Sequence, residues 1–311
     1  HTFGNIPVDR KNQPCYNFRK ILYFESEKRS IMQKRVLAVH DISCVGKCSL
    51  TVALPIISAA GIETSVLPTA VLSTHTGGFE GYTFRDLTED IRPISAHWKS
   101  LNLKMDAVYT GYLGSFEQLT LVSELIRDFR RPDTVVLVDP VMADNGKLYP
   151  LFTMDFVAGM RKLCGIADII VPNLTEAALM LGEEYRESYD RAYIEATLKK
   201  LAAIGPRKVV LSGVSFEPDK LGAASYDSAT DTISYYFAER VDGYYHGTGD
   251  VFGSALLAAV MNGFSLADSI RVAVEYTVGA IRRTKAAGTD IRYGVDFENE
   301  IPNLLRLLGK L

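Results

Sequence analysis

The sequence predicts an α/β fold in which a central, mostly parallel sheet is flanked by helices on both faces and carries a small antiparallel edge. From residue 34 onward, short apolar runs alternate with longer amphipathic stretches. The run TVVLV at 134–138 consists of β-branched residues and leucine, which is typical of a strand covered on both faces. After Ser212, two short strand-like runs are separated by polar residues, a pattern that indicates a hairpin at a sheet edge.

The same patterns place each element in order. Strands are expected at 35–39, 65–72, 107–110, 134–138, 168–171 and 208–211, with the hairpin strands at 222–226 and 232–237. Helices are expected at 50–60, 116–130, 152–164, 191–204, 250–262 and 266–285. Strands that alternate with helices imply right-handed crossovers, and these make neighbouring strands parallel.

We expect the chain to consist of a short N-terminal extension and one domain. No linker, low-complexity tract or repeat interrupts residues 32–311, so they are predicted to form a single domain. Residues 1–31 precede Met32 and lack the layout of a signal peptide. They are predicted to be an N-terminal extension, either derived from a tag or non-catalytic.

Composition excludes several classes of protein. The formal net charge is −3 and no cationic stripe is visible, which argues against a nucleic-acid binder. No apolar run approaches the roughly 20 residues that span a bilayer, so no membrane association is expected. The four cysteines at 15, 44, 48 and 164 are too scattered for a disulfide framework or a zinc site. Reduced thiols fit a cytoplasmic protein.

The most informative motif is His246-Gly247-Thr248-Gly249-Asp250, which opens a predicted helix. In open α/β sheets, ligands bind at the carboxyl ends of the strands. Two glycines at a helix start leave amide N–H groups free to bind an anion such as a phosphoryl group. Asp250 would lie beside that anion site, where its carboxylate could accept a proton from an attacking hydroxyl. The structural alternative is that Asp250 only caps the helix and the glycines only form a turn.

Two further polar groups directly follow predicted strands. Asp139 and Asp144 come after the strand at 134–138 and could hold Mg²⁺ through water, although Asp-Pro is also common turn chemistry. Asn173 and Glu176 follow the strand at 168–171 and lie on one side of a helix start. A capping box between these two residues explains them equally well.

Two loops offer contacts to a small molecule. Ser73 to Phe79 is a glycine-rich loop at a strand end, which could close over a ligand. His75 within it is as readily explained by structural hydrogen bonding. The segment Tyr109 to Gly114 places aromatic rings at another strand end, where they could stack on a flat ring or simply pack.

Taken together, these motifs resemble the pyridoxal kinase family within the ribokinase-like superfamily. The resemblance covers about residues 34–286 and is carried by ordered motifs: Ser73-Thr74-His75-Thr76-Gly77, Thr110-Gly111-Tyr112, Asp139-Pro140-Val141-Met142, Pro172-Asn173 with Glu176, and Gly247-Thr248-Gly249-Asp250. It implies a ribokinase-like fold, usually in a homodimer. It also implies transfer of phosphate from ATP to the 5′-hydroxymethyl group of a B6 vitamer, with Mg²⁺ and, as a further candidate, a monovalent cation such as K⁺.

The resemblance assigns a role to each site residue. Asp250 corresponds to the catalytic base, and Gly247, Thr248 and Gly249 correspond to the anion hole. Positions that organise Mg²⁺ and the ATP phosphates correspond to Asp139, Asp144, Asn173 and Glu176, with Asp139 and Glu176 as the metal candidates. Ser212 matches a hydroxyl residue near the nucleotide phosphates. Thr76 and Tyr112 match residues that line the pyridine pocket, and Asp41 is the candidate for contacting the ring substituents.

The sequence departs from the family pattern only on the vitamer side. The loop His40 to Lys47 replaces a Ser-His stretch and a Gly-Asn pair, and Thr74 replaces an asparagine. These changes leave open which vitamer is preferred. A hydroxymethylpyrimidine kinase is the nearest alternative, although members of that group often carry cysteine where this chain has Asp250. A non-catalytic sensor of PLP or nucleotide is an alternative of another class.

Overall fold

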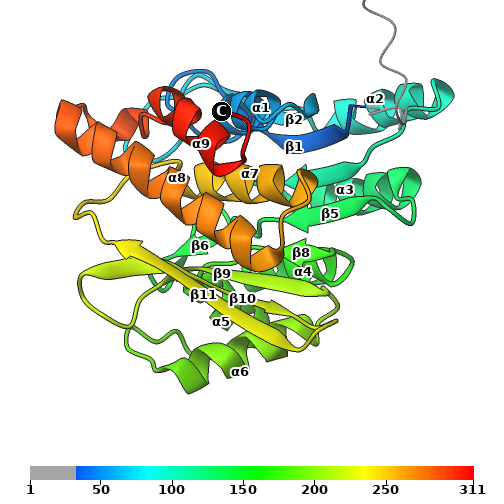
Figure 1. Cartoon of the computed structure of the whole chain (residues 1–311). Coiled ribbons are helices and arrows are strands. Elements are labelled where there is room, and N and C mark those ends of the chain that lie inside the picture. Colours follow the sequence, from blue (N-terminus) through cyan, green and yellow to red (C-terminus); the bar gives the residue numbers. More distant parts are fainter. Residues whose placement is uncertain (1–32) are drawn as a thin grey trace, which may run out of the picture. The chain divides into compact units, whose positions relative to one another are not determined.

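The computed structural model describes residues 33–311, and the predicted extension at 1–31 lies outside them. The described residues form one mixed sheet of nine strands in the order β11-β10-β9-β8-β5-β4-β1-β2-β3 (Figure 1). The strands from β9 to β2 along this order are parallel, and β3, β10 and β11 pair antiparallel. Their bounds are β1 Arg35–Ser43, β2 Glu63–Leu72, β3 Phe84–Asp86, β4 Ala107–Thr110, β5 Val135–Val138, β8 Ile169–Ile170, β9 Lys208–Val214, β10 Lys220–Asp227 and β11 Thr232–Glu239.

A second, two-stranded sheet and the helices complete the fold. The small sheet pairs β6 (Ala143–Asp144) with β7 (Lys147–Leu148). The helices are α1 Leu50–Ala59, α2 Thr88–Ser100, α3 Phe116–Phe129, α4 Met154–Gly165, α5 Leu174–Leu181, α6 Arg191–Ala202, α7 Thr248–Met261, α8 Leu266–Ala287 and α9 Ile301–Leu307, with short 3₁₀ turns η2 Ile291–Tyr293 and η3 Glu298–Glu300. The predicted α/β fold with its mostly parallel sheet and antiparallel edge is therefore confirmed.

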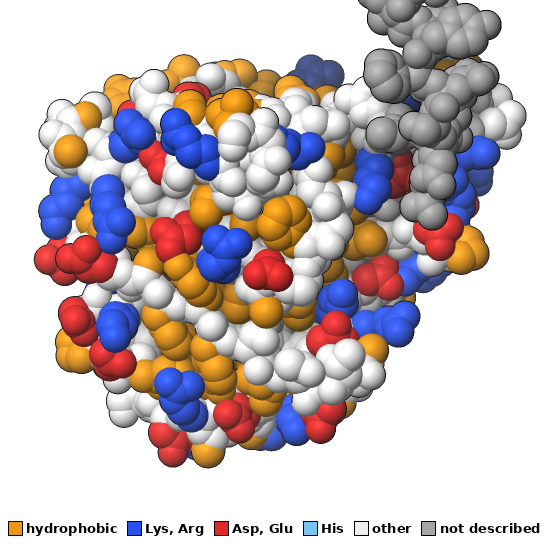
Figure 2. All heavy atoms as spheres, in the orientation of Figure 1, with side chains coloured by type: hydrophobic (Ala, Val, Ile, Leu, Met, Phe, Trp, Pro, Cys, Tyr) orange, Lys and Arg blue, Asp and Glu red, His pale blue; other side chains and the backbone are white. Residues whose placement is uncertain are grey.

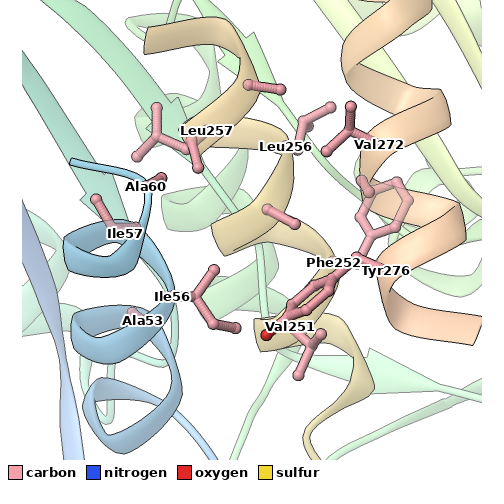
Figure 3. Packing of buried hydrophobic residues seen from close by; sticks show 14 of the residues in the cluster. Ala53, Ile56, Ile57, Ala60, Val251, Phe252, Leu256, Leu257, Val272 and Tyr276 are labelled. Carbon is pink, nitrogen blue, oxygen red and sulfur yellow. The ribbon is translucent and has the colours of Figure 1, made fainter. Parts of the chain in front are cut away.

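Helices cover both faces of the sheet. One apolar core joins α1, α7, α8 and α9 to one face, and a second core joins α2 to α6 to the other. Within the first core, Ile56 and Ile57 of α1 face Val251 and Leu257 of α7, and α8 packs on the opposite side of α7 (Figure 3). Helix α7 is consequently enclosed between two helices and the sheet, and this packing fixes the position of its first turn.

Local capping sets where the helices begin. Ser115, Thr153, Asp190 and Ser265 each precede a helix and accept a hydrogen bond from a backbone N–H of its first turn. Such caps satisfy amide groups that have no partner inside the helix. They explain why the helices at 116, 154, 191 and 266 begin within two residues of the predicted positions.

Charged side chains are mixed over the surface. Figure 2 shows lysines, arginines and acidic residues interspersed on the face in view, with apolar atoms between them. This face carries no cationic stripe of the kind that binds nucleic acid. Among the helices at 33–311, none combines the length and the apolar character needed to cross a membrane.

Candidate active site

The parallel strands end at one edge of the sheet, where the predicted site residues gather. Strand β1 has β2 on one side and β4 on the other, so the strand order reverses between β1 and β4. Ligands in doubly wound sheets bind at such a reversal. At that edge β4 ends at Thr110, Asp139 directly follows β5, and His40 is among the last four residues of β1, which ends at Ser43. Helix α7 brings its first turn to the same place, because Asp250 contacts Ser49 beyond the end of β1.

The glycine motif opens α7 without a side-chain cap. Gly247 is the N-cap residue and has φ +75°, a left-handed conformation. A Cβ at this position would lie 2.0 Å from the carbonyl oxygen of Lys47, so only glycine fits. At Gly249, by contrast, a Cβ would meet no atom within 4 Å. The first turn therefore has no side-chain cap and has open space beside Gly249, an arrangement that can bind a phosphoryl group through its backbone N–H groups.

Asp250 is held by a neighbouring loop and does not cap its own helix. Its Oδ2 accepts a hydrogen bond from the backbone N–H of Ser49 at 2.9 Å. Burial raises the pKa of Asp250 to about 7, with the Ser49 N–H lowering it and the negative charge of Asp41 raising it. A carboxyl group with a pKa near neutrality is well matched to general-base work at physiological pH.

His40 lies next to Asp250 and is a neutral imidazole. It is fully buried, and burial lowers its pKa to about 3. Its Nδ1 lies 4.0 Å from Oδ1 of Asp250, so the contact is not an ion pair. The ring packs edge-on against Tyr109 with 4.4 Å between centroids, and a Cβ on Gly111 would lie 2.2 Å from Nδ1. The glycine of the Thr-Gly-Tyr motif thus provides room for His40.

Asp41 sits at an irregularity of the sheet. The register between β1 and β2 shifts between His40 and Ile42, as at the bulges that often adjoin active sites. Both Asp41 carboxylate oxygens accept hydrogen bonds from hydroxyls, Oδ1 from Ser49 at 2.5 Å and Oδ2 from Ser43 at 3.1 Å. Burial raises the pKa of Asp41, and these two hydrogen bonds lower it. Ser49 therefore contacts both Asp41 and Asp250.

Asn173 and Glu176 form the capping box that the sequence suggested. Asn173 Oδ1 accepts from the Glu176 N–H at 2.9 Å, and Glu176 Oε2 accepts from the Asn173 N–H at 2.9 Å. Glu176 Oε1 also accepts from the Met142 N–H at 3.1 Å, and Asn173 Nδ2 donates to the Ala143 carbonyl at 2.8 Å. The capping box thereby ties α5 to the loop that follows β5.

Asp139 and Glu176 are two buried carboxyl groups, and the negative charge of Asp139 acts on Glu176. Burial raises the pKa of Asp139 well above its usual range, and the negative charge of Asp250 raises it further. Burial likewise raises the pKa of Glu176, with Asp139 as the next cause. A divalent cation would relieve both effects, and each oxygen of Glu176 keeps a second lone pair for a water ligand. The donor set therefore fits Mg²⁺.

The described residues offer few protein ligands for such a cation. Among residues 33–311, no three His, Cys, Asp or Glu side chains are grouped as a metal site. Mg²⁺ typically uses one or two carboxylates together with waters and substrate phosphates, so two carboxyl groups suffice. Asp144 lies nearby in β6 and accepts from Tyr244 Oη at 3.4 Å. Ser212 lies in β9, and its backbone N–H donates to the Pro172 carbonyl at 3.1 Å.

The loop that carries Thr76 is fixed by His75. The Nδ1 atom of His75 accepts from the Gly77 N–H at 3.0 Å, and Nε2 lies 2.6 Å from the Arg292 carbonyl oxygen. Nε2 therefore carries the proton and donates it to that carbonyl. Thr76 is exposed, and Tyr112 is half-buried with its ring 5.7 Å from Phe152. His75 has the structural role that the sequence left open.

Two parts of the site were not predicted from sequence. Ser49 precedes the helix at 50 and reads as an ordinary N-cap, but its side chain makes no cap hydrogen bond and reaches Asp41. The segment Asp290–Gly294 contacts two loops of the site: His75 donates to Arg292, and the Lys47 N–H donates to the Tyr293 carbonyl at 3.1 Å. We call this segment, residues 290–294, the strap.

Comparison with known proteins agrees with this geometry. The family model described as phosphomethylpyrimidine kinase matches residues 56–294. A pyridoxine/pyridoxal/pyridoxamine kinase from Bordetella avium is 28% identical over 264 residues, which cover 81% of this chain and 86% of that protein. Pyridoxal kinase from Sus scrofa is 29% identical, with coverage of 80% and 82%.

Solved structures give the same result. The crystal structure of pyridoxal kinase from Lactobacillus plantarum is 34% identical, covers 88% of this chain and 97% of that one, and has a TM-score of 0.82. A Bacteroides thetaiotaomicron protein described as a candidate phosphomethylpyrimidine kinase, crystallised with pyridoxal, is 39% identical, with coverage of 88% and 96% and a TM-score of 0.84. The chain therefore belongs to the phosphomethylpyrimidine kinase family, among the pyridoxal kinases.

Proposed function

We propose that this kinase transfers the γ-phosphate of ATP to the 5′-hydroxymethyl group of a B6 vitamer, in salvage of pyridoxal 5′-phosphate. The observation that carries the proposal is the pairing of Asp250, whose pKa lies at about 7, with the Gly247–Gly249 turn at the reversal of strand order. A base and an anion site on the same helical turn can act together in one in-line transfer. The base accepts the hydroxyl proton, and the anion site stabilises the transferring phosphoryl group.

In the proposed reaction, the oxygen of the vitamer hydroxymethyl group attacks the γ-phosphorus of ATP. Asp250 accepts the hydroxyl proton as the new P–O bond forms, and the bond between the γ-phosphorus and the bridging oxygen breaks to release ADP. The N–H groups of Gly247, Thr248 and Gly249 stabilise charge on the transferring phosphoryl group. Oδ2 of Asp250 already accepts the Ser49 N–H, so we assign the proton to Oδ1, which accepts no hydrogen bond from residues 33–311.

We assign the nucleotide phosphates to the neighbouring strand ends. Asp139 and Glu176 would hold Mg²⁺, which would offset the negative charge of the ATP phosphates. Asp144, Asn173 and Ser212 lie around the same edge, after β5, β8 and within β9. The capping box supports this assignment indirectly, because it fixes the Glu176 carboxylate through two backbone N–H groups.

On the vitamer side we assign Asp41, Thr76 and Tyr112 to the pyridine ring. Tyr112 and Asp41 lie close enough for the negative charge of Asp41 to be a cause, after burial, of the raised pKa of Tyr112, which is about 12. The vitamer substrate is supported by the pyridoxal bound in the Bacteroides thetaiotaomicron structure and by the vitamers named for the Bordetella avium kinase. The homodimer and the cytoplasmic setting rest on the family resemblance and on three free thiols among the described residues.

An ATP-consumption assay with Mg²⁺ tests the proposal. It compares pyridoxal, pyridoxamine, pyridoxine, hydroxymethylpyrimidine and ribose as acceptors. Turnover with the B6 compounds is expected, and their ranking identifies the preferred vitamer. Turnover with hydroxymethylpyrimidine alone would keep the phosphate site and reject the vitamer. No turnover with any acceptor would favour a sensor of PLP or nucleotide.

A further inference from the structure

Ser49 holds two carboxyl groups of the candidate site at the same time. Its backbone N–H donates to Asp250 Oδ2 at 2.9 Å, and its hydroxyl donates to Asp41 Oδ1 at 2.5 Å. Ser49 is 6% exposed and Asp41 is 3% exposed, so water does not compete freely for the hydrogen bond between them. One residue thereby links the proposed base to the proposed ring contact.

The backbone of Ser49 is in a conformation that L residues rarely adopt. Its φ is 56° and its ψ is −130°, which is costly for any residue with a Cβ. Such strain persists only where surrounding contacts impose it, and it is concentrated at functional sites. Ser49 is the N-cap residue of α1, but its hydroxyl makes no cap hydrogen bond to that helix. The contacts that fix this conformation are those to Asp41, to Asp250 and a bridge to Ile42.

We propose that Ser49 is a positioning residue for phosphoryl transfer: its hydroxyl, anchored on Asp41, keeps the strained backbone in place, so that its N–H stays aimed at Asp250. The inference rests on the proposed function, since it assigns Asp250 as the base. It also predicts how the site responds when the hydroxyl is removed. If the hydroxyl is lost, the strain is no longer balanced, and the N–H is released from Asp250 unless the residue tolerates positive φ.

Alanine and glycine separate these two properties. Ser49→Ala and Ser49→Gly remove the same hydroxyl, but only glycine adopts positive φ without steric cost. Ser43→Ala is the matched control, because Ser43 donates the other hydrogen bond to Asp41 and lies outside the strained turn. Each of the three variants removes one hydroxyl hydrogen bond to Asp41, and only Ser49→Ala is expected to displace the Ser49 N–H from Asp250.

Steady-state kinetics with Mg-ATP and pyridoxal test the proposal on the full chain. Ser43→Ala and Ser49→Gly should raise the KM for pyridoxal and keep kcat within about threefold of the wild type. Ser49→Ala should lose about 10- to 100-fold in kcat, the equivalent of one hydrogen bond to a charged group. The KM for ATP should not change, since no contact of Ser49 reaches Asp139 or Glu176.

The alternatives give different results. Equal kcat values for Ser49→Ala and Ser49→Gly would overturn the proposal, whether both are low or both are normal. Thermal unfolding of each variant identifies a folding defect, and if Ser49→Ala does not fold, a low kcat in a folded Ser49→Gly still overturns the proposal. Failure of the wild type to phosphorylate any B6 compound would reject the proposed function itself, a result distinct from any difference among variants.

Discussion

Replacement of Asp250 by asparagine should abolish most activity and at the same time stabilise the fold. Burial raises the pKa of Asp250 from 3.8 to about 7, a difference of about three units. Each unit corresponds to about 1.4 kcal/mol, so the ionised side chain costs up to about 4 kcal/mol in the folded state. Between pH 3.8 and about 7 the folded state binds more protons than the unfolded state, and stability therefore falls as pH rises.

The gain in stability from Asp250→Asn should depend on pH. The amide introduced by Asp250→Asn would still accept the Ser49 N–H but would carry no charge. Asp250→Asn should be more stable than the wild type by up to about 4 kcal/mol at pH 8 and by only about 2 kcal/mol at pH 5. Urea unfolding followed by fluorescence of Trp98, the single tryptophan, measures both values. Asp133→Asn, which alters an exposed carboxyl group before β5, is the control and should change stability by about 0.5 kcal/mol or less.

Turnover of Asp250→Asn should fall by about 10²- to 10⁴-fold, the usual contribution of a general base. In the wild type, kcat/KM should fall about tenfold per pH unit below about 7, as Asp250 becomes protonated. ATP binding by the variant should be retained. A variant with near-normal turnover would show that Asp250 is not the base. A stability difference that does not change between pH 5 and pH 8 would show that Asp250 does not titrate as a buried charge.

Four further predictions concern the rest of the site. Gly249→Ala should leave stability unchanged, because its methyl group enters open space, but should cost about 100-fold in turnover by displacing the phosphoryl group. Gly247→Ala should instead lower stability by about 1–3 kcal/mol, seen in urea unfolding, because its φ is +75°. Glu176→Gln should require more Mg²⁺ for half-maximal rate, and an unchanged Mg²⁺ titration would contradict its metal role. His75→Leu should raise the KM for the vitamer about tenfold while the KM for ATP stays constant, since it frees the Thr76 loop and its link to the strap but breaks no hydrogen bond to a residue assigned to the nucleotide.

Much of the fold could be predicted because the central strands are buried on both faces. Strand β4 has the predicted bounds of 107–110, and β5 begins one residue later than predicted. Such strands read as short continuous apolar runs, and their β-branched residues and the turn residues beside them distinguish them from buried helix segments. Helix α2 was missed because only Ile91 and Ser95 of it are buried and Pro93 interrupts it, so its sequence has little apolar periodicity.

The residues of the candidate site also fall into two groups, those that local motifs predict and those that they do not. Gly247 and Gly249 indicate a helix start that binds an anion, and Asn173 with Glu176 indicates a capping box, because each motif is local in sequence. The strap and the contact of Ser49 with Asp250 could not be found in this way, since the partners lie far apart along the chain. Arg292 meets His75 across 217 residues, and Ser49 meets Asp250 across 201. No short-range pattern encodes such contacts.

The enclosure of α7 has a consequence for how the enzyme moves. Every residue from Val251 to Ala259 is buried, so the helix that carries the proposed base belongs to the least deformable part of the molecule. Amide hydrogens of α7 beyond its first turn, from Val251 to Ala259, should exchange with solvent only through global unfolding, while those of the Thr76 loop and the strap exchange through local opening. We therefore expect the loops, and not the helix that carries the proposed base, to move when the substrate enters.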